Sequence, residues 1–472
     1  PARYIHFFCK EDVCDCERPY QGERTNLFLK ILYIDWNEQN LENCFFHTLH
    51  TNLIAMKNIT MKRPALCSKL TRRLAAYAFA FLSVLMASCG SKGNDNAQWI
   101  EKCSVIADRA VVGTDTVITC NMSAVKESVR IPFSTFLDTL EVIKLDNSNE
   151  DALVSEAHMI TVTDNYLGIN VAHYPYKLFT RQGKFIGRVG NIGQGPGEYN
   201  LIYDSQIDEA NNRIYLLPWN TEQILSYDLK GNYVESIPMP YRVRKGRIKV
   251  DYNRRRVAVL QLAFMGDPVA WVQDMEGNIL FENKSPQMDM EPDYSNEISL
   301  YCTSGSGLVF SINHYTPTAD SLYTYCTDNN RLIPLFTTDF GSEMPSHNYK
   351  DCGNYYLTDI YGPNTDPKTM HLYTATVVKR IIVDKRTLRG SYYKMVNTEL
   401  GGISLESKRW YMNEYGYTLC WDPGDLLDLI EERLADPKIS DADRKFLNVW
   451  KSKISPDDNG YVILGKRKEQ GW

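Results

Sequence analysis

The chain has 472 residues, of which 43% are hydrophobic and 12% aromatic, so it can bury a large core and is not intrinsically disordered. Its formal net charge of −6 at pH 7 argues against a general nucleic-acid binder, because such proteins are normally basic. These properties predict a folded protein without a nucleic-acid partner.

Residues 1–60 differ from the rest of the chain. The segment starts on Pro1 instead of a methionine, its cysteines show no clear periodicity, and candidate start residues follow at Met56 and Met61. We interpret it as a non-native upstream extension. The alternative is a small metal knuckle, although the cysteine spacing is not a recognised zinc pattern. Its ligands would come from Cys9, Cys14, Cys16 and His6.

Residues 61–88 have the pattern of a bacterial lipoprotein signal peptide. Basic residues precede a nearly uncharged apolar stretch at 74–86, which ends in Ala87-Ser88-Cys89. The small residues let a signal peptidase approach, and the Cys89 thiol is the nucleophile that accepts a diacylglycerol. A transmembrane helix is the alternative, but the stretch is shorter than the roughly 20 residues needed to span a bilayer. We therefore expect a lipid anchor at Cys89 and an outer-membrane location, on the periplasmic side or at the surface.

Residues 89–116 are predicted to tether the folded part to the membrane. The segment 90–96 is polar and glycine-containing, as expected of a flexible linker. Because the exported chain would meet an oxidising compartment, disulfides are permitted. Cys302 and Cys326 lie in one expected blade, where a bridge and two buried free thiols both remain possible.

A predicted β-hairpin at 176–189 introduces the main repeat of the chain. The turn Arg181-Gln182-Gly183-Lys184 separates two strand-favouring runs, and Gly183 can supply the positive φ that such a turn needs. The pattern Asp-x-x-Gly-x-apolar returns downstream, twice with the glycine and twice without it, starting at Asp228, Asp274, Asp328 and Asp384.

The hairpin is followed by a dense group of turn-forming residues. Their density is too high for regular structure and predicts a tight structural loop that crosses from one blade to the next. A nucleotide-binding loop is the alternative, but a strand-like run follows instead of the helix that a phosphate cradle needs. The residues of this structural loop are Gly190, Gly193, Gly195, Pro196 and Gly197.

A repeat of about 40–50 residues built from short strands is typical of a β-propeller. The predicted fold class is therefore all-β, a six-bladed β-propeller over residues 117–472. A lead-in strand is expected at 133–145, and apolar runs such as 212–217 and 256–260 are expected as inner strands facing the central channel. The expected blades are 146–199, 200–245, 246–290, 296–342, 352–400 and 405–465.

The last blade contains a predicted helical insertion at about 424–452. Residues 425–434 have helical apolar spacing, and Ser440 has the position of a cap for a second helix. A closing strand at 461–465 should then pair within the ring, so that the first and last blades meet and no long sheet edge stays open.

Three segments together resemble a known family. The run from Gly190 to Tyr199, which includes GQGPGEY, the lead-in ending at 142–145 and the closing segment at 457–464 resemble the six-bladed, NHL-like β-propeller lipoproteins of gut Bacteroidetes. The chain departs from that pattern where Gly460 replaces a proline and where two repeats lose their turn glycine. The resemblance implies a fold and a location, and no catalytic residues, because the activity of the family is largely undefined.

Candidate catalytic and metal-binding residues are sparse. No nucleophile motif is present, and the histidines have no ligand spacing of a strand or helix. The sequence therefore predicts no cofactor and no metal, and it favours a protein without enzymatic activity over an enzyme. A channel metal would need ligands from several blades, and the histidines at comparable blade positions are His158, His314 and His371.

Other candidate binding residues are aromatic or basic. Trp219, Tyr315 and Trp410 could stack on sugar rings, although most aromatic residues must fill space between blades. A basic cluster could bind acidic glycans or lipid headgroups, but is interpreted as a solvated loop and outer strand. The cluster comprises Arg242, Arg244, Lys245, Arg247, Lys249, Arg254, Arg255 and Arg256.

The sequence thus predicts a non-catalytic lipoprotein that binds a glycan or an envelope protein across one propeller face. The alternative is a hydrolase or lyase with a metal in the central channel. A bound metal with ligands from three or more blades would favour the alternative, and a dry, apolar channel would favour binding.

Overall fold

The computed structural model describes residues 98–155, 157–292, 295–304, 307–365, 372–405 and 411–468. These residues belong to a unit that runs from Lys92 to Trp472. Cys89, Cys9 and the other predicted features of the first 97 residues lie outside the described ranges, as do His371 and Trp410.

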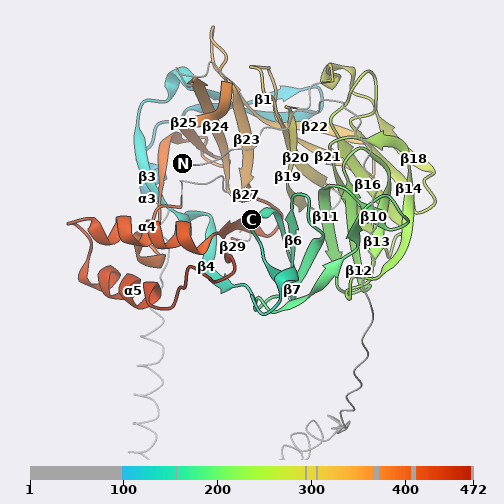
Figure 1. Ribbon diagram of the computed structural model, residues 1–472. Coiled ribbons are helices and arrows are strands. Elements are labelled where there is room, and N and C mark those ends of the chain that lie inside the picture. Colours follow the sequence, from blue (N-terminus) through green and yellow to red (C-terminus); the bar gives the residue numbers. More distant parts are fainter. Residues whose placement is uncertain are drawn as a thin grey trace, which may run out of the picture. The chain divides into compact units, whose positions relative to one another are not determined.

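Six sheets, each built on antiparallel strands, follow one another around a central axis, which confirms the predicted six-bladed β-propeller (Figure 1). The first three blades each consist of four consecutive strands. Blade one contains β5 (Ala157–Val162), β6 (Tyr166–Val171), β7 (Tyr176–Thr180) and β8 (Phe185–Val189). Blade two contains β11 (Ile202–Asp208), β12 (Arg213–Pro218), β13 (Thr221–Tyr227) and β14 (Tyr233–Val243). Blade three contains β15 (Gly246–Asp251), β16 (Arg256–Gln261), β17 (Ala270–Asp274) and β18 (Ile279–Asn283).

The fourth and fifth blades are widened by strands from the N-terminal part of the chain. Blade four contains β19 (Glu297–Ser304), β20 (Gly307–Asn313), β21 (Leu322–Cys326) and β22 (Arg331–Asp339). Blade five contains β23 (His347–Cys352), β24 (Tyr355–Thr365), β25 (Leu372–Asp384) and β26 (Gly390–Val396). The added strands are β2 (Asp115–Asn121), parallel to β22, then β1 (Ala107–Val112) on β2, and β3 (Ser128–Pro132), parallel to β26.

The sixth blade closes the ring with a strand from the start of the fold. Strand β4 (Leu137–Lys144), the predicted lead-in strand, pairs antiparallel with β29 (Tyr461–Arg467), with Ile143 opposite Val462. The predicted closing strand is therefore confirmed. Strand β4 covers the edge of β29, which would otherwise be left without a pairing strand. The two inner strands of this blade are β27 (Tyr411–Met412) and β28 (Gly416–Trp421).

The predicted helical insertion lies between β28 and β29. Helix α4 (Pro423–Ala435) begins after Asp422, whose carboxylate accepts the backbone N–H of Gly424, and α5 (Asp441–Lys451) begins after Ser440, which accepts that of Asp443. The remaining short elements are α3 (Gln98–Glu101), β9 (Asn191–Ile192), β10 (Glu198–Tyr199) and the 3₁₀ turns η1 (Met122–Ala124), η2 (Phe133–Thr135), η3 (Glu150–Ala152), η4 (Pro286–Met288) and η5 (Leu400–Gly402).

The repeated turn motif forms the hairpins that the sequence predicts. Gly183, Gly231 and Gly277 have φ of 87°, 84° and 88°. In the two weaker copies, Asn330 at 56° and Leu388 at 60° take the left-handed conformation instead. Asparagine adopts it readily because its side chain can hydrogen-bond locally, so loss of the glycine does not abolish that turn.

Three boundaries differ from the expectations. The runs 212–217 and 256–260 were expected as inner strands, but they form the second strands of their blades. The first strand of each blade lies nearest the axis, because the first strand β11 packs on the first strands β15 and β5 of the neighbouring blades. Blade five begins at His347, before the expected residue 352. Helix α3 and strand β1 fall within the expected tether, so the folded part begins before residue 117.

The ends of the ring differ in their connections. We call the end that carries the connections between second and third strands the loop face. The opposite end, the turn face, carries the tight turns between first and second and between third and fourth strands. The described loop-face connections are 172–175, 219–220, 262–269, 314–321 and 422–460.

Candidate functional site

A cavity of about 300 Å³ lies between blade two and the crossing that leads into it from blade one. One wall is the glycine-rich crossing that connects β8 to β11, and the other is the turn between β12 and β13 on the loop face. Trp219 lines this cavity together with Gln194, Glu198, Asn220 and Gln223. The predicted structural loop and one predicted binding residue therefore meet at a single groove, which we call the Trp219 groove.

Two tyrosines hold the crossing wall in place. The buried Tyr199 hydroxyl donates to the Val189 carbonyl and accepts the backbone N–H of Tyr176 at 2.8 Å. The Tyr227 hydroxyl donates to the Gly197 carbonyl at 2.8 Å. These bonds tie the crossing to strands β7, β8 and β13. They also fix its backbone where it lines the cavity.

Glycine is required at position 197. Its φ is 72°, and an added Cβ would lie 2.5 Å from the ring of Tyr233. A second bond tightens the same loop, because the Glu198 carboxylate accepts the backbone N–H of Gly195 at 2.9 Å. The density of glycine here thus reflects close approach of the loop to its own side chains.

The opposite wall presents an indole beside polar side chains. Trp219 is 42% exposed. Its backbone N–H donates to the Leu201 carbonyl at 2.8 Å, which ties the turn to the crossing. Asn220 has φ of 55°, the left-handed conformation that asparagine tolerates in tight turns. Exposed amide side chains at Gln194, Asn200 and Gln223 complete the rim.

The other predicted aromatic binding residues are not part of this groove. Tyr315 is exposed on the loop face, in the connection between β20 and β21, and does not line the cavity. Trp410 lies outside the described residues. The structure therefore does not bring the three predicted aromatic residues together.

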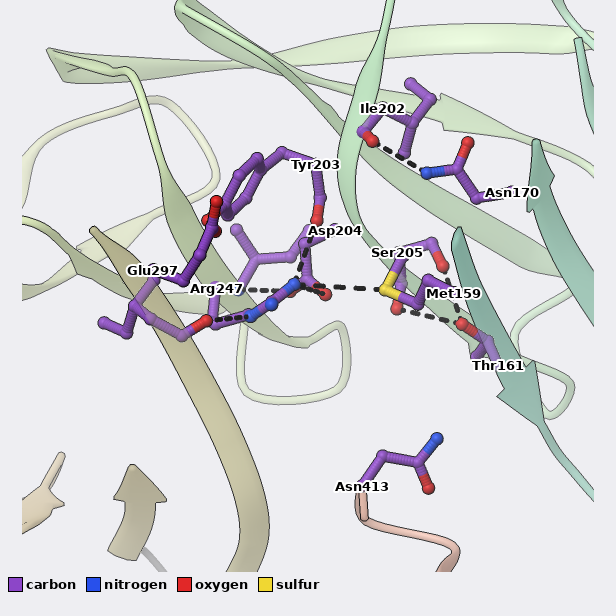
Figure 2. Close-up of polar contacts among 12 residues, drawn as sticks. Met159, Thr161, Asn170, Ile202, Tyr203, Asp204, Ser205, Arg247, Glu297 and Asn413 are labelled. Atoms are coloured by element: carbon purple, nitrogen blue, oxygen red, sulfur yellow. Dashed lines mark hydrogen bonds and ion pairs between the residues drawn. The ribbon is translucent and has the colours of Figure 1, made fainter. Parts of the chain in front are cut away.

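The central channel contains a polar network organised by Arg247 (Figure 2). Its guanidinium donates to the carbonyls of Tyr203 at 2.9 Å and Ile298 at 3.0 Å. It also pairs with the Asp204 carboxylate at 3.3 Å and points toward the Met159 sulfur. One side chain thus bridges first strands of four blades.

The network extends around the channel. Lys249 pairs with Glu414 of the sixth blade at 3.1 Å, and the Arg467 guanidinium donates to the carbonyls of Tyr301 and Asn413. The channel is therefore polar, and among the described residues no set of metal ligands lines it. The apolar channel that would favour binding is not observed.

Burial dominates the electrostatics of this network. It raises the pKa of Asp204 above the usual range of an aspartate, although Arg247 and the backbone N–H of Ile248 favour its ionised form. Burial also raises the pKa of Tyr203, and the nearby Glu297 carboxylate adds to the effect. The charged pair holds blades together and leaves little charge available for a ligand.

The predicted basic patch is neutralised by its surroundings. Lys245, Arg247 and Lys249 lie on or beside β15, next to the axis, so their placement on an outer strand was wrong. Seven of the eight residues have acidic partners. The partners are Glu222, Asp267, Glu297, Asp204, Glu414, Asp251 and Glu276.

Two of the described histidines, His314 and His347, lie near the Asp320 carboxylate. His158 is exposed, and His314 pairs with Asp320 at 3.3 Å. His347 is buried, and burial lowers its pKa. In the part of the chain that the structure describes, no group of three or more His, Cys, Asp or Glu side chains is placed to hold a metal ion.

Five cysteines are free thiols, namely Cys103, Cys120, Cys326, Cys352 and Cys420. Cys326 is one of them, so the possible bridge to Cys302 is not formed. Burial raises the pKa of Cys120 and of Cys352 to about 12. Both thiols are therefore protonated at neutral pH and unreactive as nucleophiles.

A second cavity of about 270 Å³ lies on the turn face between blades two, three and four. It is lined by charged turn residues, including Asp208, Asp251, Arg254 and Asp328. Neither this cavity nor the channel network was predicted from the sequence. A signal for the network exists in the equal spacing of 44 residues between contacting positions of consecutive blades, such as Thr161 and Ser205.

The comparisons with known proteins give a family and solved structures. A family model described as "Domain of unknown function (DUF4934)" matches residues 115–466. The chain is similar to the crystal structure of a candidate exported protein from Bacteroides fragilis NCTC 9343, at 15% identity over 72% of this chain and 99% of that chain, with a TM-score of 0.48. It is also similar to a member of the DUF4221 family from Bacteroides vulgatus, at 12% identity over 71% and 98% of the chains, with a TM-score of 0.39.

A third similar structure is a protein of unknown function from Bacteroides caccae, at 9% identity over 49% and 80% of the chains, with a TM-score of 0.31. None of the curated proteins matches the chain. No helix within the described ranges has the length and apolar character needed to cross a bilayer. The family match and the sheet arrangement confirm the inferred propeller family of undefined activity.

Proposed function

This chain belongs to the DUF4934 family, and on that premise we propose that it is a cell-envelope lipoprotein whose propeller binds a glycan or a partner protein without catalysis. Cys89 would carry the lipid anchor, and the loop face would bind the ligand. The proposal rests on where exposed apolar side chains lie in the ring.

Every described connection between second and third strands carries an exposed large apolar side chain. Their exposed fractions range from 42% for Trp219 to 79% for Met265. The tight turns within the blades at the turn face carry none among the described residues, and the exposed apolar side chains at that end are those of Val111 and Val112 in the added β1–β2 hairpin and Val105 where the chain enters the fold. The exposed loop-face residues are Tyr174, Trp219, Met265, Tyr315, Phe446 and Val449.

This distribution supports binding at the loop face. Single exposed apolar residues are common on any protein and need no explanation. Here they recur in the long connections at one end of five blades. The short turns within the blades at the other end carry none, although the same need for solubility applies there. Exposed aromatic and methionine side chains are enriched at recognition surfaces.

The entry of the chain into the fold supports the same orientation. The backbone N–H of Ile106 donates to the Leu388 carbonyl at 3.0 Å, and the ring of Trp99 lies 5.8 Å from that of Tyr355. Leu388 and Tyr355 belong to the turn face of blade five. A tether that joins the fold there would leave the loop face free to meet a ligand.

A paired-variant experiment tests the binding face. One variant combines Tyr174→Ser, Trp219→Ser, Met265→Ser and Tyr315→Ser on the loop face. The control combines Ile186→Ser and Ile279→Ser on outer strands, where the side chains are 39% and 40% exposed. Each protein is screened against a glycan panel by thermal shift and used to isolate partners from detergent-solubilised membranes of the native host.

We expect a ligand that raises the melting temperature, or a partner that copurifies, with the wild type and the control but not with the loop-face variant. Equal loss in both variants would contradict the proposal, as would metal-dependent hydrolase or lyase activity. The anchor is tested separately by mass spectrometry of the native protein, in which an unmodified Cys89 sulfur would refute lipidation.

A further inference from the structure

We propose that the Trp219 groove is a binding site for one or two rings of a neutral saccharide, with the Trp219 indole as the stacking platform. This inference deepens the proposed function, because it assumes that the loop face binds a ligand. It goes further in placing the site and in naming the chemical class of the ligand.

The size of the groove favours a small ligand unit. Its volume of about 300 Å³ lies at the lower end of the range of roughly 300–1,000 Å³ for small-molecule sites. The apolar part of the lining comes from Leu201 of the crossing and from Pro218, Trp219 and Leu225 of the opposite wall. A pyranose ring has a matching pair of surfaces, since its C–H face is apolar and its rim carries hydroxyl groups.

The polar lining fits hydroxyl groups. Each amide side chain offers two N–H donors and a carbonyl acceptor, and a sugar hydroxyl can use both kinds of partner. Within the described part of the chain, the amides of Gln194, Asn200 and Gln223 make no hydrogen bond with other protein groups. They can therefore bind a ligand without first breaking an internal bond.

Charge favours a neutral ligand over an acidic one. The lining contains no lysine, arginine or histidine that could neutralise a carboxylate, sulfate or phosphate. The nearby Arg242 pairs with Glu222 at 2.9 Å, and the lining carboxylate of Glu198 already accepts a backbone N–H. An anionic sugar would meet the Glu198 charge without a cation to offset it.

The groove is also organised before binding. The bonds of Tyr199 and Tyr227 fix the crossing, and the Trp219 backbone is bonded to Leu201. Rigid walls reduce the entropy that a ligand would otherwise lose in ordering the loop. This accounts for the glycine-rich crossing as a wall of the site as well as a connection between blades.

The test measures saccharide affinity in matched variants of the full chain. The probes are cellotetraose, maltotetraose, mannotetraose, xylotetraose and chitotetraose at up to 5 mM, with polygalacturonate tetramer as the acidic comparison. Affinity is measured by calorimetry and by tryptophan fluorescence. The variants are Trp219→Ala, Trp219→Phe and Gln223→Ala, with Tyr315→Ala as the control exposed aromatic on the same face.

We expect at least one neutral tetramer to bind. Trp219→Ala should weaken it tenfold or more, Gln223→Ala several-fold, while Trp219→Phe keeps most of the affinity and Tyr315→Ala changes it by less than twofold. Circular dichroism melting of each variant confirms that the fold is intact.

Several results would overturn the inference. Binding of none of the neutral tetramers, preference for the acidic tetramer, or equal affinity in the wild type and Trp219→Ala would each exclude this site. If Tyr315→Ala instead abolishes binding, or a protein partner is lost only in the loop-face variant, the proposed function stands and the saccharide groove does not. If no saccharide binds and the loop-face variant also loses neither a ligand nor a partner, the proposed function is refuted as well.

Discussion

Replacing Arg247 with methionine tests whether the channel network holds the propeller together. The side chains of Arg247 and Asp204 are only 19% and 11% exposed, so solvent screens their interaction little. Removing one partner of such a buried pair costs about 3–5 kcal/mol, because the other charge stays buried without compensation. The Tyr203 and Ile298 carbonyls would lose their donor as well. We therefore expect Arg247→Met to lower the free energy of unfolding by about 4 kcal/mol.

The loss should depend on pH in a defined direction. Burial already raises the pKa of Asp204, and Arg247 opposes that shift. Without the guanidinium the pKa rises further. A carboxyl group whose pKa is raised in the folded state favours folding when it is protonated, so the deficit of the variant is full at neutral pH and shrinks as the pH falls through that pKa. Urea unfolding at pH 7.5 and pH 5 measures both values.

Two further variants test whether the Arg247–Asp204 pair is the cause of this loss. Arg247→Met combined with Asp204→Asn removes both charges and should cost less than Arg247→Met alone. Arg242→Met removes an arginine whose ion pair with Glu222 is about half exposed, and should cost less than about 1 kcal/mol. A loss below 1 kcal/mol in Arg247→Met, or a loss independent of pH, would show that the network does not stabilise the ring.

Three other changes have defined consequences. Asn459→Ala should cost about 3 kcal/mol or more in urea unfolding, because the buried amide donates to the Asp146 and Ala152 carbonyls at 2.7 and 2.8 Å and accepts the Val154 N–H at 2.8 Å. Gly197→Ala should cost about 2 kcal/mol by thermal unfolding, because φ is 72° and the methyl group would meet the ring of Tyr233. His347 should make stability fall as the pH drops below about 6.5, because burial lowers its pKa and the unfolded chain takes up the proton first; His347→Gln should remove that dependence.

Matched controls separate these effects from general damage. Asn147→Ala removes an exposed amide at the same junction and should cost less than about 1 kcal/mol. Gly113 also has a positive φ, of 66°, but a Cβ added there meets no atom within 4 Å. The difference in stability loss between Gly197→Ala and Gly113→Ala therefore measures the steric clash with Tyr233. His158→Gln changes an exposed histidine and should leave the pH dependence intact. Equal effects in a variant and its control would contradict the corresponding prediction.

Local features of this protein were predictable from its sequence. The turn glycines at 183, 231 and 277 require positive φ, which few other residues adopt, so their spacing revealed the blades before any contact was known. Ser440 likewise indicated the start of a helix, because an N-cap hydroxyl accepts a backbone N–H only three residues further along the chain. Such features depend on neighbours a few residues away, and a sequence displays those neighbours directly.

The relation between distant segments was decided only by the tertiary structure. The sequence placed Arg247 in a basic patch, whereas ring closure puts it beside Asp204 and the Ile298 carbonyl in the channel. It placed the glycine-rich loop and Trp219 separately, whereas the folding of the crossing against the β12–β13 turn of blade two makes them opposite walls of one groove. Propensity and spacing act along the chain, but these contacts depend on the register and stacking of whole blades, which arise from the combined burial of many side chains.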